Sequence, residues 1–241
     1  MEPRPVAIVT GATGGIGLAV ARKLDDRGYS VLVHGYRDEE RGRQISAELT
    51  DSVYLDADVS DHAQSAAIAA LAQDRWGRID VLVNNAGIGE PIPHASLDSV
   101  TPELWQRYLG VNLLGPWFLV LAAADCLRER RGSVLNMASI AGLVVSGSSI
   151  PYAVSKAGLI HLTRLLSVVL GPDIRVNAVA PGYIETARTS SWTEVRHEVT
   201  TRSPLRRLGV PDDVAAACMS LLDSPYTTGA VLTVDGGLSL V

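Results

Sequence analysis

The chain has 241 residues, a hydrophobic share of 47% and a formal net charge of −5, which are ordinary values for one globular domain. It contains no basic block, so the composition argues against non-specific nucleic-acid binding. The two cysteines, Cys126 and Cys218, lie in apolar helical patterns and are expected to be buried side chains rather than a disulfide or a metal pair.

Targeting and metal-binding signals are not found in the sequence. It shows no signal-peptide pattern and no uninterrupted apolar run long enough to span a bilayer, so we expect a cytoplasmic protein without membrane contact. The five histidines are scattered and do not form a ligand cluster, so no metal site is predicted.

The N-terminal part of the chain has the pattern of a strand, a glycine loop and a helix. Val6–Val9 is a short apolar, β-branched run, which is typical of a buried parallel strand. The loop TGATGGIG at residues 10–17 follows, and an amphipathic pattern then runs to Gly28, a candidate helix cap. Glycines let the backbone approach a diphosphate, and a helix N-terminus offers free N–H groups. The segment therefore predicts a nucleotide-diphosphate site, with an ordinary glycine-rich turn as the alternative.

Alternation of strands and helices continues to the end of the chain. It predicts a single α/β domain over residues 1–241, built as a doubly wound Rossmann-type parallel sheet of about seven strands with helices on both faces. After Val6–Val9, the expected strands are Val31–Val33, Val53–Leu55, Val81–Val83, Ser133–Asn136, Arg175–Val179 and Val231–Val234. Expected helices include Asp61–Trp76 and Tyr152–Leu170. The long irregular connection over residues 181–208 is predicted to be a substrate lid.

Tyr152 and Lys156 lie four positions apart, on one face of a predicted helix. A free tyrosine titrates near pH ~10, and a nearby positive charge favours its phenolate and lowers its pKa. The pair therefore indicates an acid/base device. A surface tyrosine beside a solvated lysine is the more ordinary interpretation when this pair is considered alone.

Several motifs, taken in order, resemble those of the short-chain dehydrogenase/reductase family over nearly the whole chain. The loop at residues 10–17 is similar to the family's cofactor loop, N-N-A-G at residues 84–87 follows the fourth strand, and Ser139 precedes Tyr152 by thirteen residues. The resemblance implies a catalytic set of Asn112, Ser139, Tyr152 and Lys156. The resemblance and the residues at the end of the second strand together predict a set of cofactor contacts. These are Thr10, Gly11, Gly15, Ile16, Gly17, Tyr36, Arg37, Asp58, Val59, Asn85, Ala86, Gly87, Tyr152, Lys156, Pro181, Gly182, Ile184 and Thr186.

Each catalytic residue has an expected role in reducing a carbonyl. Tyr152 donates the proton, and Ser139 hydrogen-bonds the same oxygen and stabilises its developing charge. Lys156 lowers the pKa of Tyr152 and, by resemblance, binds the nicotinamide ribose, while Asn112 holds a water. The structural alternatives are a turn cap for Ser139 and backbone hydrogen bonding for Asn112. The alternative for Asp58 is capping of the helix that begins near Asp61.

The end of the second strand bears on the choice of dinucleotide. An acidic residue there binds the ribose 2′-OH of NAD, whereas an arginine accommodates the 2′-phosphate of NADP. Tyr36 stands at this position and Arg37 follows, which favours NADP(H). Gly14 stands where many NADP-using relatives carry a basic residue, so NAD(H) is kept as the alternative.

Three interpretations of the function are carried forward. The first is an NADP(H)-dependent reductase resembling the 3-oxoacyl-thioester reductases, and the second is an NAD-dependent alcohol, sugar or steroid dehydrogenase. The third is a non-catalytic dinucleotide sensor, which the intact catalytic set disfavours. The expected pocket lining at residues 142–145, Ile150 and Tyr183 is apolar without a charged anchor, which favours an uncharged or weakly polar carbonyl compound.

Partner surfaces are predicted from two further features. The basic run at residues 128–131 could meet an acyl-carrier protein, although a solvated helix end is the alternative. By resemblance we expect a homotetramer in which two long helices, within Thr101–Arg131 and Tyr152–Leu170, pair with their copies. The apolar ending Leu238–Val241 is expected to pack against a neighbouring subunit.

Overall fold

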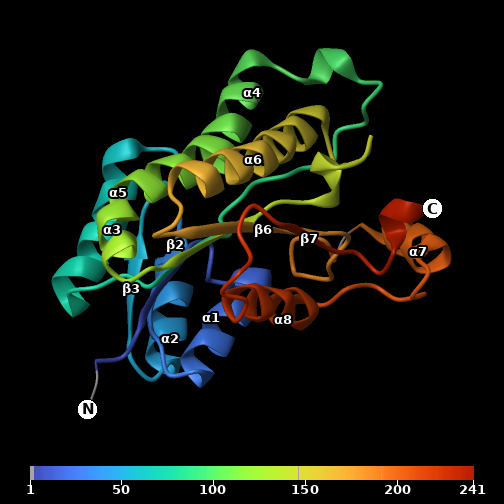
Figure 1. Ribbon diagram of the computed structural model, residues 1–241. Coiled ribbons are helices and arrows are strands. Elements are labelled where there is room, and N and C mark those ends of the chain that lie inside the picture. The colour runs from blue at the N-terminus through green and yellow to red at the C-terminus, as the bar shows by residue number, and fades with distance from the viewer. Residues whose placement is uncertain (1–2, 146, 191) are drawn as a thin grey trace.

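The computed structural model describes residues 3–145, 147–190 and 192–241. Its centre is a seven-stranded sheet in the order β3-β2-β1-β4-β5-β6-β7, and every neighbouring pair of strands is parallel (Figure 1). The strands are β1 Val6–Val9, β2 Ser30–Gly35, β3 Ser52–Asp56, β4 Val81–Asn84, β5 Ser133–Met137, β6 Arg175–Pro181 and β7 Val231–Val234. The predicted doubly wound α/β architecture is confirmed, and every predicted strand is present.

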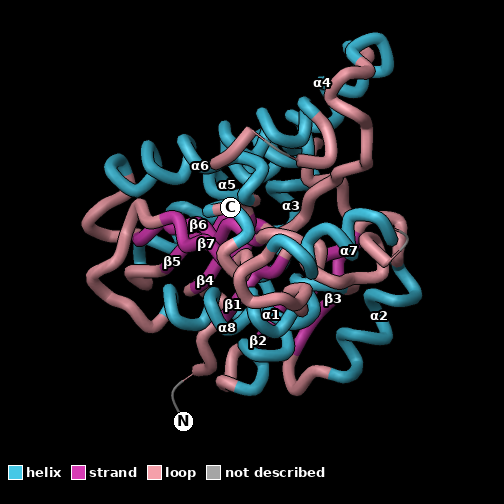
Figure 2. The backbone as a smooth tube through the Cα atoms, turned by 90° about the vertical axis from the view of Figure 1, so that its right-hand side faces the viewer, coloured by secondary structure: helices cyan, strands magenta, loops and turns pink. Residues whose placement is uncertain are grey.

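Helices cover both faces of the sheet, as Figures 1 and 2 show. One face carries α1 Gly15–Asp26, α2 Glu39–Glu48 and α8 Pro211–Leu222. The other carries α3 His62–Trp76, α4 Pro102–Leu109, α5 Gly115–Glu129 and α6 Ile150–Val169. The short helix α7 Thr193–Arg202 stands apart from both layers, beyond the carboxyl ends of the strands. This edge of the sheet is where ligands bind in folds of this kind.

The strands divide their side chains between two hydrophobic cores. In β1, Ala7 and Val9 join the core beneath α1, α2 and α8, whereas Val6 and Ile8 join the core beneath α3, α5 and α6. This alternation follows from the two-residue period of a strand. All four side chains are fully buried, so β1 is fixed from both faces and presents the glycine loop from a rigid base.

The long helical segment departs from a regular α-helix at one place. α4, the π-helical turn η2 Gly110–Leu114 and α5 run on without a break from Pro102 to Glu129. This segment corrects the expectation that nothing in the chain is long enough to span a membrane, because it meets that criterion by length and composition. Core helices meet the same criterion, and α5 contributes Leu119, Ala123 and Leu127 to the core. Length and composition therefore do not indicate a membrane span here.

One further expectation needs correction. The connection over residues 181–208 is not irregular throughout, because it contains α7. The expected capping glycine of α1 is confirmed: Gly28 has a left-handed φ of +82°, and its N–H donates to the Asp25 carbonyl oxygen at 2.8 Å. The last turn at the C-terminus, η4 Leu238–Leu240, lies near α7 (Figure 1).

Candidate active site

A cavity of about 890 Å³ opens at the carboxyl ends of β4, β5 and β6. Its walls include the glycine loop, the segments after β4 and β5, α6, the 181–208 segment and the C-terminal turn. Ser139, Tyr152 and Lys156 all line it, together with Asn85, Gly87, Pro181, Gly182, Ile184 and Thr186. The structure therefore brings three of the predicted catalytic residues and much of the predicted cofactor set to one cavity.

The glycine loop and the segment after β4 are locked together by hydrogen bonds. The Thr10 hydroxyl accepts from the backbone N–H groups of Asn85 and Ala86, each at 2.9 Å. The Asn85 amide donates to the carbonyl oxygens of Thr10, at 2.8 Å, and Gly11, at 3.0 Å. Asn85 is therefore a structural brace of the loop, whatever contact it makes with a ligand.

Glycine is required at particular loop positions by close approach. A Cβ on Gly17 would lie 2.2 Å from the Gly11 carbonyl oxygen, and Gly11 and Gly15 have φ values of +61° and +53°. A Cβ on Gly15 would lie 3.2 Å from Cγ2 of Thr186, so the 181–208 segment begins directly over the N-terminus of α1. The cradle fits a dinucleotide diphosphate, which binds where glycines expose free N–H groups at a helix N-terminus.

His34 on β2 is a buried residue of this site that sequence analysis did not single out. Its Nδ1 accepts from the backbone N–H of Gly11 at 3.2 Å, and its Nε2 lies 2.9 Å from the Ala57 carbonyl oxygen. These bonds require the neutral tautomer with the proton on Nε2. Burial lowers the pKa of this histidine and so favours that neutral form. The side chain joins the glycine loop to the end of β3.

Four of the predicted cofactor contacts, Tyr36, Arg37, Asp58 and Val59, lie just after the ends of β2 and β3. The Arg37 guanidinium lies 5.0 Å from the centre of the Tyr36 ring, and Arg37 has a left-handed φ of +57°. Both side chains are exposed.

Asp58 accepts from the Ser60 backbone N–H and hydroxyl, whereas Asp61 accepts from Gln64 N–H and caps α3. The alternative role of Asp58 as the cap of this helix is therefore wrong; the neighbouring Val59 is buried.

Ser139 follows β5 and begins the short turn η3 Ile140–Gly142. Its hydroxyl accepts from Ala141 N–H at 3.2 Å and donates to the Pro181 carbonyl oxygen at 3.5 Å. It lines the same cavity as Tyr152 and acts to lower the pKa of that phenol. The Ser139 hydroxyl therefore caps this turn and also faces the cavity that Tyr152 lines.

Lys156 is buried one helical turn after Tyr152. Its Nζ donates to the Met137 carbonyl oxygen at 2.7 Å and lies 5.8 Å from the centre of the Tyr152 ring. Burial, with a smaller effect of Arg188, lowers the pKa of Lys156 to about 7. Burial raises the pKa of Tyr152, and the nearby Ser139 side chain opposes this. The expectation that Lys156 lowers the pKa of Tyr152 is therefore not met, because burial has the larger effect.

Asn112 lies in η2 and is fully buried. Its Oδ1 accepts from Ile88 N–H at 2.9 Å, and its Nδ2 donates to the Ile88 carbonyl oxygen and to Ser155 Oγ, each at 3.0 Å. The backbone-satisfying alternative thus describes its contacts in this structure. A Cβ on Gly87 would lie 3.2 Å from Asn112 Oδ1 and 3.4 Å from Lys156 Nζ, so the segment after β4 packs directly against both side chains.

The expected pocket lining is correct only in part. Val144, Val145 and Tyr183 line the cavity, whereas Gly142, Leu143 and Ile150 do not. The expectation of no charged anchor is wrong, because Arg188, Glu198 and Arg202 also line it. Sequence analysis missed them because their positions depend on the path of the 181–208 segment and on α7. An arginine two residues after the predicted ligand residue Thr186 was the one available signal.

The C-terminal residues pack on the chain's own cavity. Leu238, Ser239 and Val241 line it, and Arg202 Nη2 donates to the Val241 carbonyl oxygen at 3.0 Å. Leu240 and Val241 keep 85% and 61% of their surface exposed. This exposed apolar surface leaves the expected contact with a neighbouring subunit as a prediction.

No group of three or more histidine, cysteine or acidic residues in the described part of the chain is arranged to hold a metal ion. Cys218 is buried, as expected, whereas Cys126 is only half-buried and its thiol donates to Gln73 Oε1 at 2.9 Å.

Comparison with known proteins places this site in context. A family model described as enoyl-(acyl carrier protein) reductase matches residues 11–239. A protein of Streptomyces violaceoruber, assigned as ketoacyl reductase 2 of the granaticin polyketide synthase, is 48% identical over 241 residues, which cover 98% of this chain and 97% of that protein. L-rhamnose 1-dehydrogenase (NAD(P)(+)) of Azotobacter vinelandii is 39% identical over 246 residues, which cover 96% and 95% of the two chains. A crystal structure from Burkholderia xenovorans, assigned as a short-chain dehydrogenase/reductase, has a TM-score of 0.93 and 34% identity, with 100% of both chains covered.

Proposed function

Because this chain belongs to the short-chain dehydrogenase/reductase family, whose members use NAD(P)(H), we propose that it is an NADP(H)-dependent reductase of a 3-oxoacyl thioester or related ketone. The family makes it an oxidoreductase acting on CH–OH and C=O groups. The cofactor, the substrate class and the role of each residue are our proposal. The observation that carries it is that Ser139, Tyr152 and Lys156 line one cavity, with Lys156 Nζ 5.8 Å from the centre of the Tyr152 ring.

The bound cofactor supplies the hydride. Tyr152 O–H donates the proton to the carbonyl oxygen, and Ser139 O–H hydrogen-bonds the same oxygen as negative charge develops on it. Lys156 holds the ribose of the nicotinamide and shares protons with Tyr152, for which a pKa of about 7 suits it at neutral pH. Asn112 keeps the segment after β4 in place through Ile88, and we propose that it also holds the proton-relay water.

Arg37 supports the NADP(H) assignment. Its guanidinium is exposed at the end of β2, where it contacts the Tyr36 ring and forms no ion pair within the described residues, and so is available for a 2′-phosphate. We expect NADPH to bind more tightly than NADH. The Arg37→Ala substitution should raise the Kd for NADPH about ten-fold and leave the Kd for NADH unchanged. Fluorescence titration with both reduced cofactors tests this. A parent preference for NADH, or an equal effect on both cofactors, contradicts the assignment.

An NAD-dependent sugar dehydrogenase is the second candidate, with alcohol and steroid dehydrogenases in the same class. It is supported by the 39% identity to an L-rhamnose dehydrogenase that is described as using NAD(P)(+). The decisive assay combines β-ketothioesters, simple ketones and aldoses with each of the four nicotinamide cofactors, followed by absorbance of the reduced ring. Turnover confined to aldoses with NAD⁺ would overturn the first candidate. A non-catalytic dinucleotide sensor would bind cofactor and turn over none of these compounds.

We further propose a homotetramer in the cytoplasm. The exposed side of α6 carries apolar residues, including Leu165, Val168 and Val169, with 52%, 80% and 75% of their surfaces exposed. Such a patch on a helix is typical of an interface. Light scattering at micromolar concentration tests this, and a mass near the 25.6 kDa of one chain excludes it. An acyl-carrier protein is a further candidate partner, although Arg128 at the basic run is already paired with Asp125 at 2.8 Å.

A further inference from the structure

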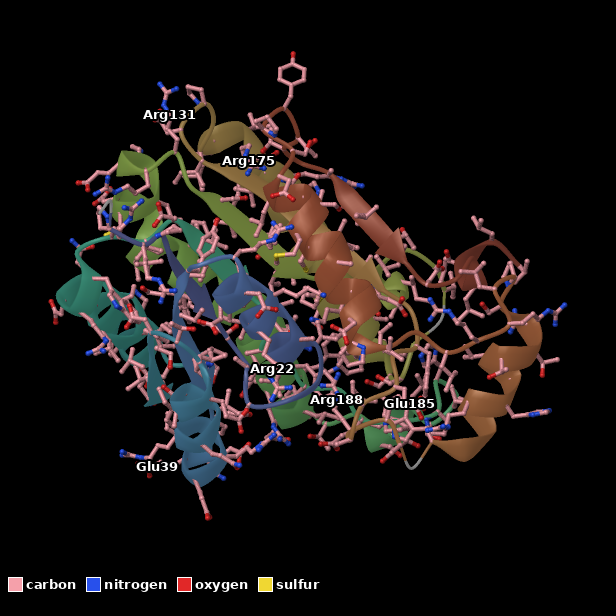
Figure 3. All side chains as sticks on the ribbon, turned by 90° about the horizontal axis from the view of Figure 1, so that it is seen from below. Arg22, Glu39, Arg131, Arg175, Glu185 and Arg188 are labelled. Atoms are coloured by element: carbon pink, nitrogen blue, oxygen red, sulfur yellow. The ribbon has the colours of Figure 1, made fainter. Side chains whose placement is uncertain are left out.

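Arg188 links the two walls of the cavity. It lies in the connection between β6 and α7, and its Nη1 donates to the Gly87 carbonyl oxygen, after β4, at 3.0 Å. Figure 3 labels Arg188 with Glu185 of the same connection. Because Gly87 packs against Lys156, this bond holds a second cation close to the buried ammonium group.

Arg188 differs from Arg196 and Arg202, two other arginines of the 181–208 segment, because they are paired with acidic side chains and it is not. Arg196 pairs with Glu185 at 2.6 Å, and Arg202 pairs with Glu198 at 2.7 Å. Among the described residues, no acidic side chain is paired with Arg188, and its guanidinium donates instead to the neutral Gly87 carbonyl group. The cavity therefore carries a positive charge without a counter-charge, which suits an anionic ligand group.

The position of Arg188 indicates which anionic group it would meet. Thr186, two residues earlier, lies against Gly15 at the N-terminus of α1, where a dinucleotide diphosphate is expected. The side chain of Arg188 then reaches across to Gly87, near Lys156. The guanidinium thus lies between the expected diphosphate and the expected nicotinamide ribose.

We propose that Arg188 is a binding residue for the diphosphate of the nicotinamide dinucleotide. On binding, its guanidinium exchanges the Gly87 carbonyl oxygen for the diphosphate oxygens and so closes the 181–208 segment over the cofactor. This exchange is favourable because the guanidinium then meets a group of opposite charge, and arginine–phosphate pairs frequently form two parallel hydrogen bonds in place of one. The inference rests on the dinucleotide-binding part of the proposed function.

A diphosphate contact predicts a specific pattern of affinities. NADPH and NADH share the diphosphate, so loss of Arg188 weakens both equally, unlike the NADPH-selective effect expected for Arg37. A charged contact in an exposed position is also screened by salt. The parent protein should therefore lose more affinity than an Arg188 variant when the salt concentration is raised.

The test is fluorescence titration of the ligand-free protein with NADPH and with NADH, without substrate, in low and high sodium chloride. We expect Arg188→Met to raise the Kd of both cofactors about ten-fold at low salt and by less at high salt. Arg188→Lys should recover part of the affinity because it keeps the charge. The matched control is Arg196→Met, in the same segment, which should change either Kd by less than about two-fold.

The outcomes separate this inference from the proposed function. Unchanged affinities in a folded Arg188→Met protein overturn the diphosphate assignment alone, as does an effect confined to NADPH. A parent protein that binds neither dinucleotide overturns the proposed function and this assignment together. Circular dichroism of each variant establishes that the compared proteins are folded.

Discussion

The two sides of the cavity are held in place by different means. The catalytic wall, which we define as Asn112, Ser139, Tyr152 and Lys156, stands on β5, η2 and α6, and Asn112 and Lys156 in it are buried and bonded to backbone groups. The 181–208 segment opposite is held partly by exposed ion pairs, such as Arg196 with Glu185, beside hydrogen bonds such as that from the Tyr183 hydroxyl to the Thr189 carbonyl oxygen. Exposed ion pairs contribute little to stability, whereas a buried, hydrogen-bonded wall keeps its geometry.

This difference assigns separate tasks to the two sides. Proton transfer needs groups held at fixed positions, which the wall supplies. Admission and release of ligands need a segment that opens at small cost, which ion pairs on the surface allow. Substitutions in the wall should therefore affect the chemical step most, and substitutions in the 181–208 segment should affect affinity.

The largest effect is expected for Tyr152→Phe. This change removes the proposed proton donor and keeps the ring, so kcat should fall by about 10³-fold while the Kd for NADPH changes little. Steady-state assays and cofactor titration measure the two quantities. Activity within a few-fold of the parent would remove Tyr152 from its proposed role and weaken the contrast between the two sides.

Lys156→Ala should reduce kcat by about 10²-fold and also weaken cofactor binding, because two roles are proposed for the ammonium group. A lysine with a purely structural role would leave the cofactor Kd unchanged in a folded variant. Fluorescence titration beside the activity assay distinguishes these results, and Lys156→Arg is the charge-retaining comparison.

The burial of Lys156 also predicts a dependence of stability on pH. Its pKa is about 7 in the folded protein and ~10.4 in the unfolded chain, so between these values the unfolded state binds more protons. The free energy of unfolding should then rise with pH, by at most about 1.4 kcal/mol per unit from this group, and the contribution is lost as pH falls toward 7.

Urea unfolding of the parent and of Lys156→Met from pH 7 to 9 measures this contribution as a difference between two proteins. The comparison cancels the opposite effect of Cys218, whose thiol pKa burial raises to about 12. Parallel pH profiles for the two proteins would show that the ammonium group is not desolvated as the structure indicates.

The smallest effect is expected in the 181–208 segment. Arg202 joins Glu198 of α7 to the Val241 carbonyl oxygen at the edge of the cavity. Arg202→Met should raise the KM for the carbonyl substrate by up to about five-fold and leave kcat and the cofactor Kd unchanged. A fall in kcat comparable to that of the wall variants would abolish the proposed division of tasks.

The same contrast explains how much could be predicted from the sequence. β1, the glycine loop and the Tyr152–Lys156 spacing are local patterns, and local patterns fix strands, turns and helix faces. All seven strands were therefore predicted, while the family resemblance predicted that Ser139 and Tyr152 share one site, and both line the cavity.

What could not be predicted depends on contacts between distant segments. The bond from Arg188 to Gly87 joins residues 101 positions apart, and His34 meets Gly11 across 23 positions. The pKa values of Tyr152 and Lys156 are set mainly by burial, which spacing alone does not reveal. The substrate-facing lining was incomplete for the same reason.

The π-helical turn η2 has a consequence for the evolution and engineering of this chain. A π-turn arises when one extra residue is accommodated in an α-helix, and it rotates everything beyond it by about 100° relative to an uninterrupted helix. Asn112 sits inside this turn, while α5 beyond it supplies the core residues Leu119 and Leu127. Deleting a single residue from 110–114 would restore helical regularity and yet turn the core-facing side of α5 away from the sheet. The length of this turn and the hydrophobic pattern of α5 are therefore coupled, and a change in one requires a compensating change in the other.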